Sequence, residues 1–347
     1  MEIAELVDFL RNYDGKPIRL MEVCGSHTHA IAKHGIRGLL SDKIELLSGP
    51  GCPVCVTPTA YIDKLIELSL QENTTVVTFG DLLRVPGSEE SLNAAKGRGG
   101  SVEMVYSPMD VLQLAKDNPY RIYVFAAVGF ETTAPVYTLL LDQAVEQGLY
   151  NIRLLTALKT MPGAISYLCD NGARIDGFIA PGHVSAVTGA DYFNDLAKKY
   201  QIPFAVSGFG AKELVVAIYG LVQMVINGDS SVKNFYTSVV EQDKNPVIEM
   251  QINKYFEAAD VAWRGMGIIP GSGLLLKDDY KQFDAGSMGL DVDNKKNKAC
   301  RCGEILMGKA KPSDCPLFGT ACTPSNPAGA CMVSEEGACN SVYLSKN

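Results

Sequence analysis

Between about residues 18 and 230, short apolar runs typical of β-strands alternate with segments typical of helices. This alternation is characteristic of an α/β fold with parallel sheets. The run 121–128 is almost wholly apolar, as expected of a central parallel strand covered on both faces. The expected strands cover residues 18–23, 44–47, 75–79, 101–106, 121–128, 152–157, 176–179 and 203–206. The expected helices cover residues 61–71, 109–116, 135–147, 192–199 and 211–226.

The same pattern suggests a division into three domains. A break near residues 116–119 predicts two doubly wound parallel-sheet domains, over residues 1–118 and 119–232. After about residue 230 the alternation weakens, and a Gly-rich segment (265–273), a charged link (291–298) and a cysteine-rich tail follow. Because a loop-rich tail buries little core by itself, we predict that residues 233–347 form a third domain organised by a cofactor.

Composition excludes several classes of function. A net charge of −8, with no Lys/Arg-rich run, argues against nucleic-acid binding. No apolar run reaches the length of about 18 residues that a membrane span requires. The N-terminus lacks the basic start and apolar block of a signal peptide. Ten cysteines without such a signal predict a reducing compartment, the cytoplasm, where they act as metal ligands or redox groups.

The tail carries most of the cysteines. Six of the ten lie in the last 48 residues, as Cys300, Cys302, Cys315, Cys322, Cys331 and Cys339. Thiolates select soft metals, which leaves zinc or an iron–sulfur cluster. The spacing is too wide for the close pairs of a zinc ribbon, and it lacks the dense cysteine run of bacterial ferredoxins. The pattern favours a cluster over zinc without deciding between them.

Two further cysteine motifs follow expected strands. Cys24 lies between a strand and a helix, where the helix dipole favours the thiolate, and His27 follows within one turn as a shared ligand or base. An inert buried cysteine is the alternative. Cys52 and Cys55 are separated by two residues in a Gly/Pro turn, so they can close a disulfide, bind one metal ion or be inert.

Other polar residues also follow strands. In parallel sheets the loops at the carboxyl ends of the strands line the ligand crevice, which predicts a site between the two α/β domains. Glu131 has an alternative role as the cap of its helix. The residues at expected strand ends are Cys24, Cys52, Cys55, Asp81, Glu131 and His183.

Together these motifs closely resemble the [NiFe]-hydrogenase maturation factor HypD family, in order from about residue 16 to about residue 343. The matching segments are Cys24-Gly-Ser-His-Thr-His, Gly-Pro-Gly-Cys52-Pro-Val-Cys55, Gly-Phe-Glu131-Thr-Thr, Pro-Gly-His183-Val and the spaced tail cysteines. The resemblance implies a role in building the Fe(CN)2CO unit of the hydrogenase active site. The implied partners are the chaperone HypC, which brings a metal-binding cysteine, and HypE, which supplies cyanide derived from a carbamoyl group.

The resemblance also implies a fold and a set of roles. It implies two α/β domains and a third domain with a [4Fe–4S] cluster, which forms an electron relay with a dithiol as in ferredoxin:thioredoxin reductase. Cys24 matches the iron-binding thiol, with His27 beside it. Cys52 and Cys55 match the redox-active pair, and Glu131 the carboxylate of the central cleft. The matched cluster ligands are Cys302, Cys315, Cys322 and Cys339, whereas Cys300 and Cys331 fall outside the spacing.

These roles agree with general chemistry. Iron with strong-field ligands suits the soft thiolate and imidazole donors of Cys24 and His27. A cluster supplies electrons one at a time, whereas a dithiol stores two. The alternative function is a stand-alone iron–sulfur thiol-disulfide oxidoreductase, which has no use for a third thiol beside an imidazole. A structural zinc protein is a third option. No phosphate-binding loop of the Gly-x4-Gly-Lys-Ser/Thr type supports nucleotide hydrolysis.

Overall fold

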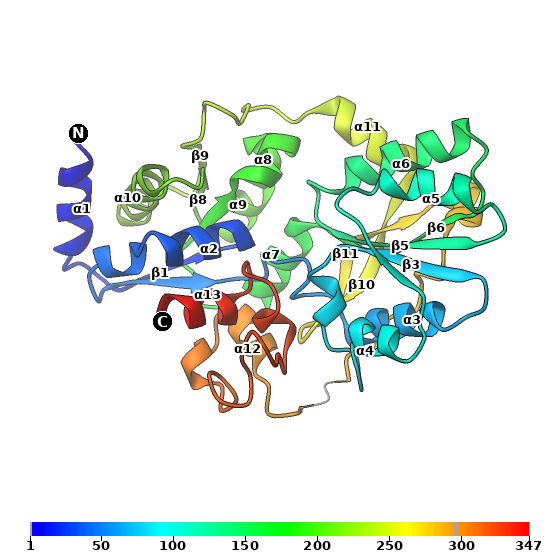
Figure 1. Ribbon diagram of the computed structural model, residues 1–347. Coiled ribbons are helices and arrows are strands. Elements are labelled where there is room, and N and C mark those ends of the chain that lie inside the picture. The colour runs from blue at the N-terminus through cyan, green and yellow to red at the C-terminus, as the bar shows by residue number, and fades with distance from the viewer. Residues whose placement is uncertain (1, 295–296, 347) are drawn as a thin grey trace.

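The computed structural model describes residues 2–294 and 297–346, so residues 295 and 296 of the charged link lie outside it. The chain forms two sheets flanked by helices, followed by a tail of short helices and turns (Figure 1). This confirms the predicted α/β class. Each expected strand and helix begins and ends within two residues of an observed one. Among the described residues, no helix has the length and apolar character needed to cross a bilayer.

The first sheet, sheet A, is parallel throughout and has the strand order β2-β1-β7-β8-β9. Its strands are β1 (Ile18–Glu22), β2 (Ile44–Ser48), β7 (Gly177–Pro181), β8 (Phe204–Ser207) and β9 (Val232–Asn234). Successive residues of a strand face opposite sides. Leu20 therefore packs with helices α1 (Ile3–Arg11) and α10 (Ala211–Asn227), whereas Met21 joins the core on the other face. Both faces of sheet A are covered.

The second sheet, sheet B, has the strand order β10-β11-β6-β5-β3-β4. Its strands are β3 (Thr74–Thr78), β4 (Val102–Met104), β5 (Ile122–Gly129), β6 (Ile152–Lys159), β10 (Phe256–Trp263) and β11 (Gly267–Leu276). Val124 of β5 packs in the core with α3 (Thr59–Ser69), and Phe125 in the core with α6 (Ala134–Glu146). As its apolar run predicts, β5 is central and buried on both faces.

The strand order does not follow the domain boundary expected near residue 118. β1 and β2 precede it, yet β1 pairs with β7, which follows it; β3 precedes it, yet pairs with β5. The chain therefore crosses from sheet A to sheet B after β2 and returns after β6. A helical crossover is long enough to reach either sheet, so the strand pattern locates strands without identifying their partners.

The region after residue 232 also differs from the expected third domain. β10 and β11 form an antiparallel hairpin, and β11 pairs with β6, so residues 256–276 extend sheet B. The Gly-rich segment 265–273 resembles a loop in sequence, but most of it lies in β11. Gly273 is required there by close packing, because a Cβ atom would lie 2.3 Å from Cγ1 of Val261.

The tail packs against both sheets instead of forming a separate core. Its helices include α12 (Cys302–Leu306) and α13 (Ala338–Lys346), and α13 contacts α2 (Gly25–Lys33) of sheet A. Figure 1 shows the tail in orange and red along one side of the molecule. The buried tail cysteines belong to the same apolar cluster as Met21 of sheet A and Val124 of sheet B.

The interleaved sheets predict that residues 1–118 cannot fold alone. This fragment contains β1 and β2 without β7, and β3 without its central neighbour β5. Exposed edges and a missing core should leave it without a cooperative transition. Circular dichroism during urea unfolding measures this, with the full chain as the control. A sigmoidal transition for the fragment would show that the boundary near residue 118 separates independent domains.

Candidate functional site

Cys24 and the loop of Cys52 and Cys55 adjoin because their strands are neighbours. β1 and β2 are parallel and in register up to Glu22 and Ser48, so both following loops leave the same edge of sheet A. The amide of Gly25 donates to the carbonyl of Gly51, with an N···O distance of 2.7 Å. A Cβ atom at Gly51 would lie 2.2 Å from the backbone nitrogen of Cys24. Only glycine permits this approach of the two loops.

Cys24 is the N-cap of α2, as expected from the sequence, but its surroundings oppose ionisation. Burial raises the pKa of the thiol to about 12, and the carboxylates of Glu336 and Glu22 add to this increase. Hydrogen bonds from the first backbone amides of α2 act in the opposite direction. The helix N-terminus therefore favours the thiolate, as expected, but burial outweighs it. In the metal-free protein Cys24 holds its proton, whereas a coordinated cation removes such a proton.

His27 is fully buried and has one nitrogen without a partner. Its Nε2 lies 3.1 Å from the carbonyl oxygens of both Ser207 and Gly208. Carbonyls only accept, so Nε2 carries the proton and Nδ1 keeps a lone pair. Nδ1 is buried and has no hydrogen-bond partner among the described residues. Burial lowers the pKa of His27 to about 4, so the ring is neutral and Nδ1 can accept a proton or bind a metal.

An aromatic stack connects His27 to His183, the histidine of a second predicted motif. The ring of Phe209 lies 4.6 Å from that of His27 and 4.0 Å from that of His183, measured between centroids. The three rings lie on segments that follow three different strands of sheet A. His27 is in α2, which follows β1; His183 is in α8 (Gly182–Thr188), which follows β7; and Phe209 follows β8. The shared strand-end placement predicted from sequence therefore holds for these residues.

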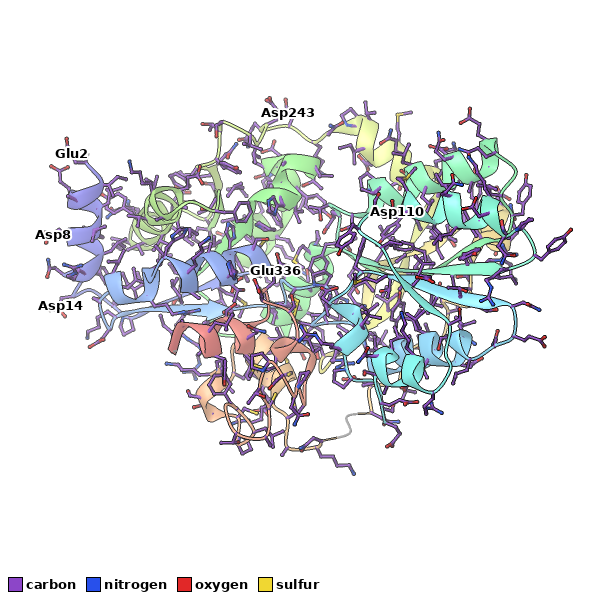
Figure 2. The ribbon with its side chains drawn as sticks, viewed as in Figure 1. Glu2, Asp8, Asp14, Asp110, Asp243 and Glu336 are labelled. Carbon is purple, nitrogen blue, oxygen red and sulfur yellow. A yellow bond between two sulfur atoms is a disulfide. The ribbon has the colours of Figure 1, made fainter. Side chains whose placement is uncertain are left out.

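Two acidic residues beside Cys24 were not predicted from the sequence. Glu22, in β1, is fully buried and accepts hydrogen bonds from the Cys24 amide and the Thr28 hydroxyl, and burial raises its pKa to about 8. Glu336, in the tail, accepts a 2.6 Å hydrogen bond from Ser26 (Figure 2). Glu22 could have been found from the sequence, because an acidic residue at the end of an apolar strand is unusual. Only the fold brings Glu336 to α2, so no sequence signal marked it.

Cys52 and Cys55 form a disulfide in this structure, with their Cα atoms 5.2 Å apart. Both are buried. Sγ of Cys55 lies 3.9 Å from the carbonyl oxygen of Ala330, the tail residue before Cys331. Through Gly51 the same loop packs against the backbone of Cys24 and accepts a hydrogen bond from Gly25. The disulfide loop is thus in contact with the Cys24 site and with the cysteine-rich tail.

The tail gathers all six of its cysteines, including the two outside the expected spacing. Sγ of Cys300 lies 3.2 Å from Sγ of Cys302, and a side chain on Gly329 would collide with both sulfur atoms. Hydrogen bonds from the thiols of Cys300, Cys331 and Cys339 lower the pKa of Cys302 below its usual range. All six side chains are buried.

These six thiols form a soft donor set suited to iron–sulfur or zinc chemistry. Among the described residues, however, no three His, Cys, Asp or Glu side chains are arranged to hold a single metal ion. Sulfur contacts join Cys302 to Cys300, Cys331 and Cys339. Sγ of Cys322 instead accepts a hydrogen bond from the Ala328 amide, and Sγ of Cys315 lies 4.0 Å from the Ala299 carbonyl oxygen. The composition of the group fits a thiolate-bound cluster, and the thiols must separate to admit one.

Glu131 lies in a different environment from the cysteines. Its Oε1 accepts hydrogen bonds from the Met161 amide (2.7 Å) and the Tyr192 hydroxyl (2.9 Å), while Oε2 is buried and finds no partner in the part of the chain that the structure describes. Burial raises its pKa to about 7. Glu131 lines a cavity of about 190 Å³ together with residues of α11 (Pro246–Tyr255). Within residues 2–294 and 297–346, no cysteine lines this cavity and the hydrogen bonds of Glu131 go to Met161 and Tyr192, away from the Cys24 site.

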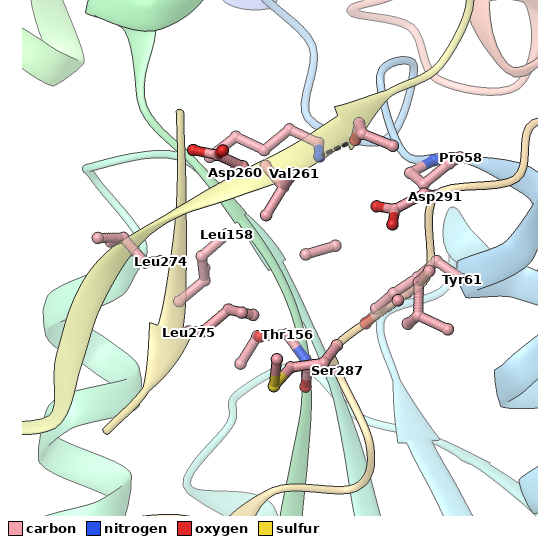
Figure 3. A pocket seen from close by; sticks show the side chains of 16 residues that line it. Pro58, Tyr61, Thr156, Leu158, Asp260, Val261, Leu274, Leu275, Ser287 and Asp291 are labelled. Atoms are coloured by element: carbon pink, nitrogen blue, oxygen red, sulfur yellow. Dashed lines mark hydrogen bonds between the residues drawn. The ribbon is translucent and has the colours of Figure 1, made fainter. Parts of the chain in front are cut away.

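Another cavity, of about 210 Å³, lies beside β6 and β10 (Figure 3). It is lined by Lys159, whose buried amino group donates a 2.6 Å hydrogen bond to the carbonyl of Ala262 and lies 5.3 Å from the Trp263 ring. Burial lowers the pKa of Lys159 to about 7. Thr156 contributes a buried hydroxyl that has no partner among the residues described. The described residues that line this cavity include no cysteine, so it is separate from the thiol groups.

Comparison with known proteins places the chain in a family. The chain matches the HypD profile, described as the hydrogenase formation hypA family, over residues 2–346. It is 42% identical to the hydrogenase maturation factor HypD of Escherichia coli, across 99% of this chain and 95% of the relative. It is 40% identical to a putative hydrogenase expression/formation protein of Methanocaldococcus jannaschii (99% and 94%) and to HypD of Rhodobacter capsulatus (97% and 92%). The chain belongs to the HypD family of hydrogenase maturation factors.

The buried Glu131 predicts a pH-dependent stability. Its folded pKa of about 7 exceeds the ordinary value of 4.5, so between these pH values the folded chain binds more protons and stability falls as pH rises. Glu131→Gln should remove this loss, raising the free energy of unfolding by up to about 3 kcal/mol at pH 8 and little at pH 4.5.

Denaturant unfolding at both pH values measures the effect. Glu249→Gln is the matched control, because Glu249 lines the same cavity but is exposed. An equal gain from both variants at pH 8 would show that the Glu131 carboxyl is not destabilised by burial.

Proposed function

We propose that this protein is a scaffold and redox factor in [NiFe]-hydrogenase maturation. It assembles the Fe(CN)2CO unit with HypC and HypE, and it uses a [4Fe–4S] cluster and a dithiol as an electron relay. The observation that carries the proposal is the position of the Cys52–Cys55 loop. That loop packs against the backbone of Cys24 through Gly51, and its Cys55 contacts Ala330, the tail residue before Cys331.

The iron of the Fe(CN)2CO unit is the cargo, and Cys24 is its proposed thiolate ligand. Nδ1 of His27 is buried, neutral and without a partner, which supports a role as a second donor or as the acceptor of the Cys24 proton. The nearby carboxylate of Glu336 favours a bound cation, whereas the buried Glu22, whose pKa is raised to about 8, holds its proton at neutral pH. Before iron binds, burial keeps Cys24 protonated. This protects it from side reactions, because the reactive form of a cysteine is the thiolate.

The proposed cluster ligands are Cys302, Cys315, Cys322 and Cys339, and a cluster held by them would supply single electrons. Cys52 and Cys55 hold a pair of electrons as two thiols. Forming their disulfide releases two electrons and two protons. Contact of Cys55 with Ala330 supports electron exchange between the pair and the tail. The names of the relatives support the maturation role.

The alternative is a stand-alone iron–sulfur thiol-disulfide oxidoreductase. It requires the tail and the disulfide loop alone. The buried Cys24 with the unpartnered Nδ1 of His27, both beside that loop, favours the scaffold.

The scaffold proposal predicts that Cys24 is essential for function and dispensable for folding. Cys24→Ala removes one sulfur atom from a strand end and should cost about 1 kcal/mol of stability or less. The variant should keep its iron–sulfur content, yet its complex with HypC should lack the infrared bands of cyanide and CO. His27→Ala should weaken these bands, fully if His27 is a ligand and partly if it is a base. A full set of bands in Cys24→Ala would place the iron elsewhere, with Cys52 or Cys55 as the next candidates.

The proposed ligand set predicts a division among the tail cysteines. Replacing Cys302, Cys315, Cys322 or Cys339 by Ala should abolish cluster binding and loosen the tail, because ligand binding is coupled to folding. Cys300→Ala and Cys331→Ala are the matched controls, since both are buried in the same group but fall outside the spacing. Iron and sulfide analysis after anaerobic reconstitution measures the outcome. Loss of the cluster in Cys331→Ala, with retention in Cys339→Ala, would contradict the set.

A further inference from the structure

Arg264 is a buried cation that connects the disulfide loop to the rest of the core. It lies in the turn between β10 and β11, and its side chain is 5% exposed. Nε donates a 2.6 Å hydrogen bond to the carbonyl of Thr57, and Nη2 donates a 2.7 Å bond to the carbonyl of Pro86. The Arg264 backbone amide donates to the carbonyl of Val56. Arg264 thus binds the two residues that follow Cys55.

The same guanidinium faces the tail cysteines. Arg264, Cys300, Cys302 and Gly329 line one small cavity. Backbone contact fixes this arrangement, because a Cβ atom on Gly303 would lie 2.6 Å from the carbonyl oxygen of Gly265. The residues after Cys302 and after Arg264 are therefore packed directly together. Burial lowers the pKa of Arg264, whereas Asp293 and the thiolate forms of Cys302, Cys331 and Cys300 lie close enough to raise it.

One carboxylate accompanies the cation without forming a close pair. Oδ1 of Asp293 lies 3.8 Å from Nε of Arg264. The same carboxylate accepts hydrogen bonds from the amides of Gly265 (2.7 Å) and Thr59 (3.3 Å). An arginine remains protonated in proteins, even when it is buried. Arg264 therefore keeps a positive charge beside the thiols, partly offset by Asp293.

We infer that Arg264 tunes the reduction potential of the cluster site, an inference that rests on the proposed function. Adding one electron to a thiolate-bound cluster makes it more negative by one charge. A buried cation stabilises that reduced form more than the oxidised form, because low-dielectric surroundings strengthen the attraction. Arg264 raises the potential, Asp293 lowers it, and the hydrogen bonds of Arg264 hold the disulfide loop beside the cluster.

The test is a reductive titration of the reconstituted full-length protein with dithionite, followed by electron paramagnetic resonance. Arg264→Gln should favour the oxidised form about tenfold, which corresponds to a potential about 59 mV more negative for one electron. Arg264→Lys keeps the positive charge, so its reduction potential should stay close to that of the wild type. Asp293→Asn removes the offsetting charge and should move the potential in the positive direction.

Arg301→Gln is the matched control. Arg301 adjoins Cys302 in sequence, but its guanidinium is exposed and pairs with Glu304, so solvent screens its charge. Equal potentials in Arg264→Gln and Arg301→Gln would overturn the inference, as would a negative shift in Asp293→Asn. Asp293→Asn also decides the question if Arg264→Gln fails to fold.

Iron and sulfide analysis of the wild type separates this inference from the proposed function. A wild-type protein without a cluster would overturn both. A cluster that forms in the wild type, but whose reduction potential is unchanged in the Arg264 and Asp293 variants, would overturn the tuning role alone.

Discussion

The arrangement of the site depends on the close approach of two backbone loops at one edge of sheet A. The parallel register of β1 and β2 brings the loop after Glu22 beside the loop after Ser48. Gly51 then lies so close to Cys24 that any side chain would collide with its backbone. This contact places the disulfide of Cys52 and Cys55 next to the proposed iron ligand. A residue other than glycine at position 51 would push the Cys52–Cys55 disulfide away from Cys24, and the proposed function needs both at one site.

The tail completes the site by contributing charge and thiols to a core that belongs to both sheets. Glu336 reaches Ser26, and the cysteines pack in one cluster with residues of sheet A and sheet B. Under the proposed function, thiols that contact one another lose those contacts when a cluster binds, so the gain from ligand binding must exceed that loss. The surrounding sheets supply a frame that does not depend on the cluster, which explains why the tail has little apolar core of its own.

Sequence alone located β1 to β8 and the loops after them, but neither β9 to β11 nor the pairing of the strands. Apolar runs mark a strand such as β5 to within two residues, and the chemistry of strand ends singled out Cys24, His27 and His183 as candidates. Sheet membership depends on crossovers that leave no local signal, so the interleaving of sheets A and B was missed. β11 was missed because Gly267, Gly271 and Gly273 imitate a loop. The hydrogen-bond partners of Glu131 and the contact of Glu336 with Ser26 arise from tertiary packing. Such contacts leave no local signal in a single sequence.

The electrostatics around Cys24 show how one site can protect a thiol and still bind a cation. Burial and the carboxylate of Glu336 keep the proton on the sulfur of Cys24, while the neutral His27 keeps a lone pair on Nδ1. Burial and the negative charge disfavour a free thiolate, and the same negative charge favours a positive ion. A cation that displaces the proton converts the repulsion between the thiolate and Glu336 into attraction of both to the cation. Under the proposed function, iron delivery and deprotonation of Cys24 are therefore one coupled event, and the protein needs no persistent thiolate beside its own disulfide.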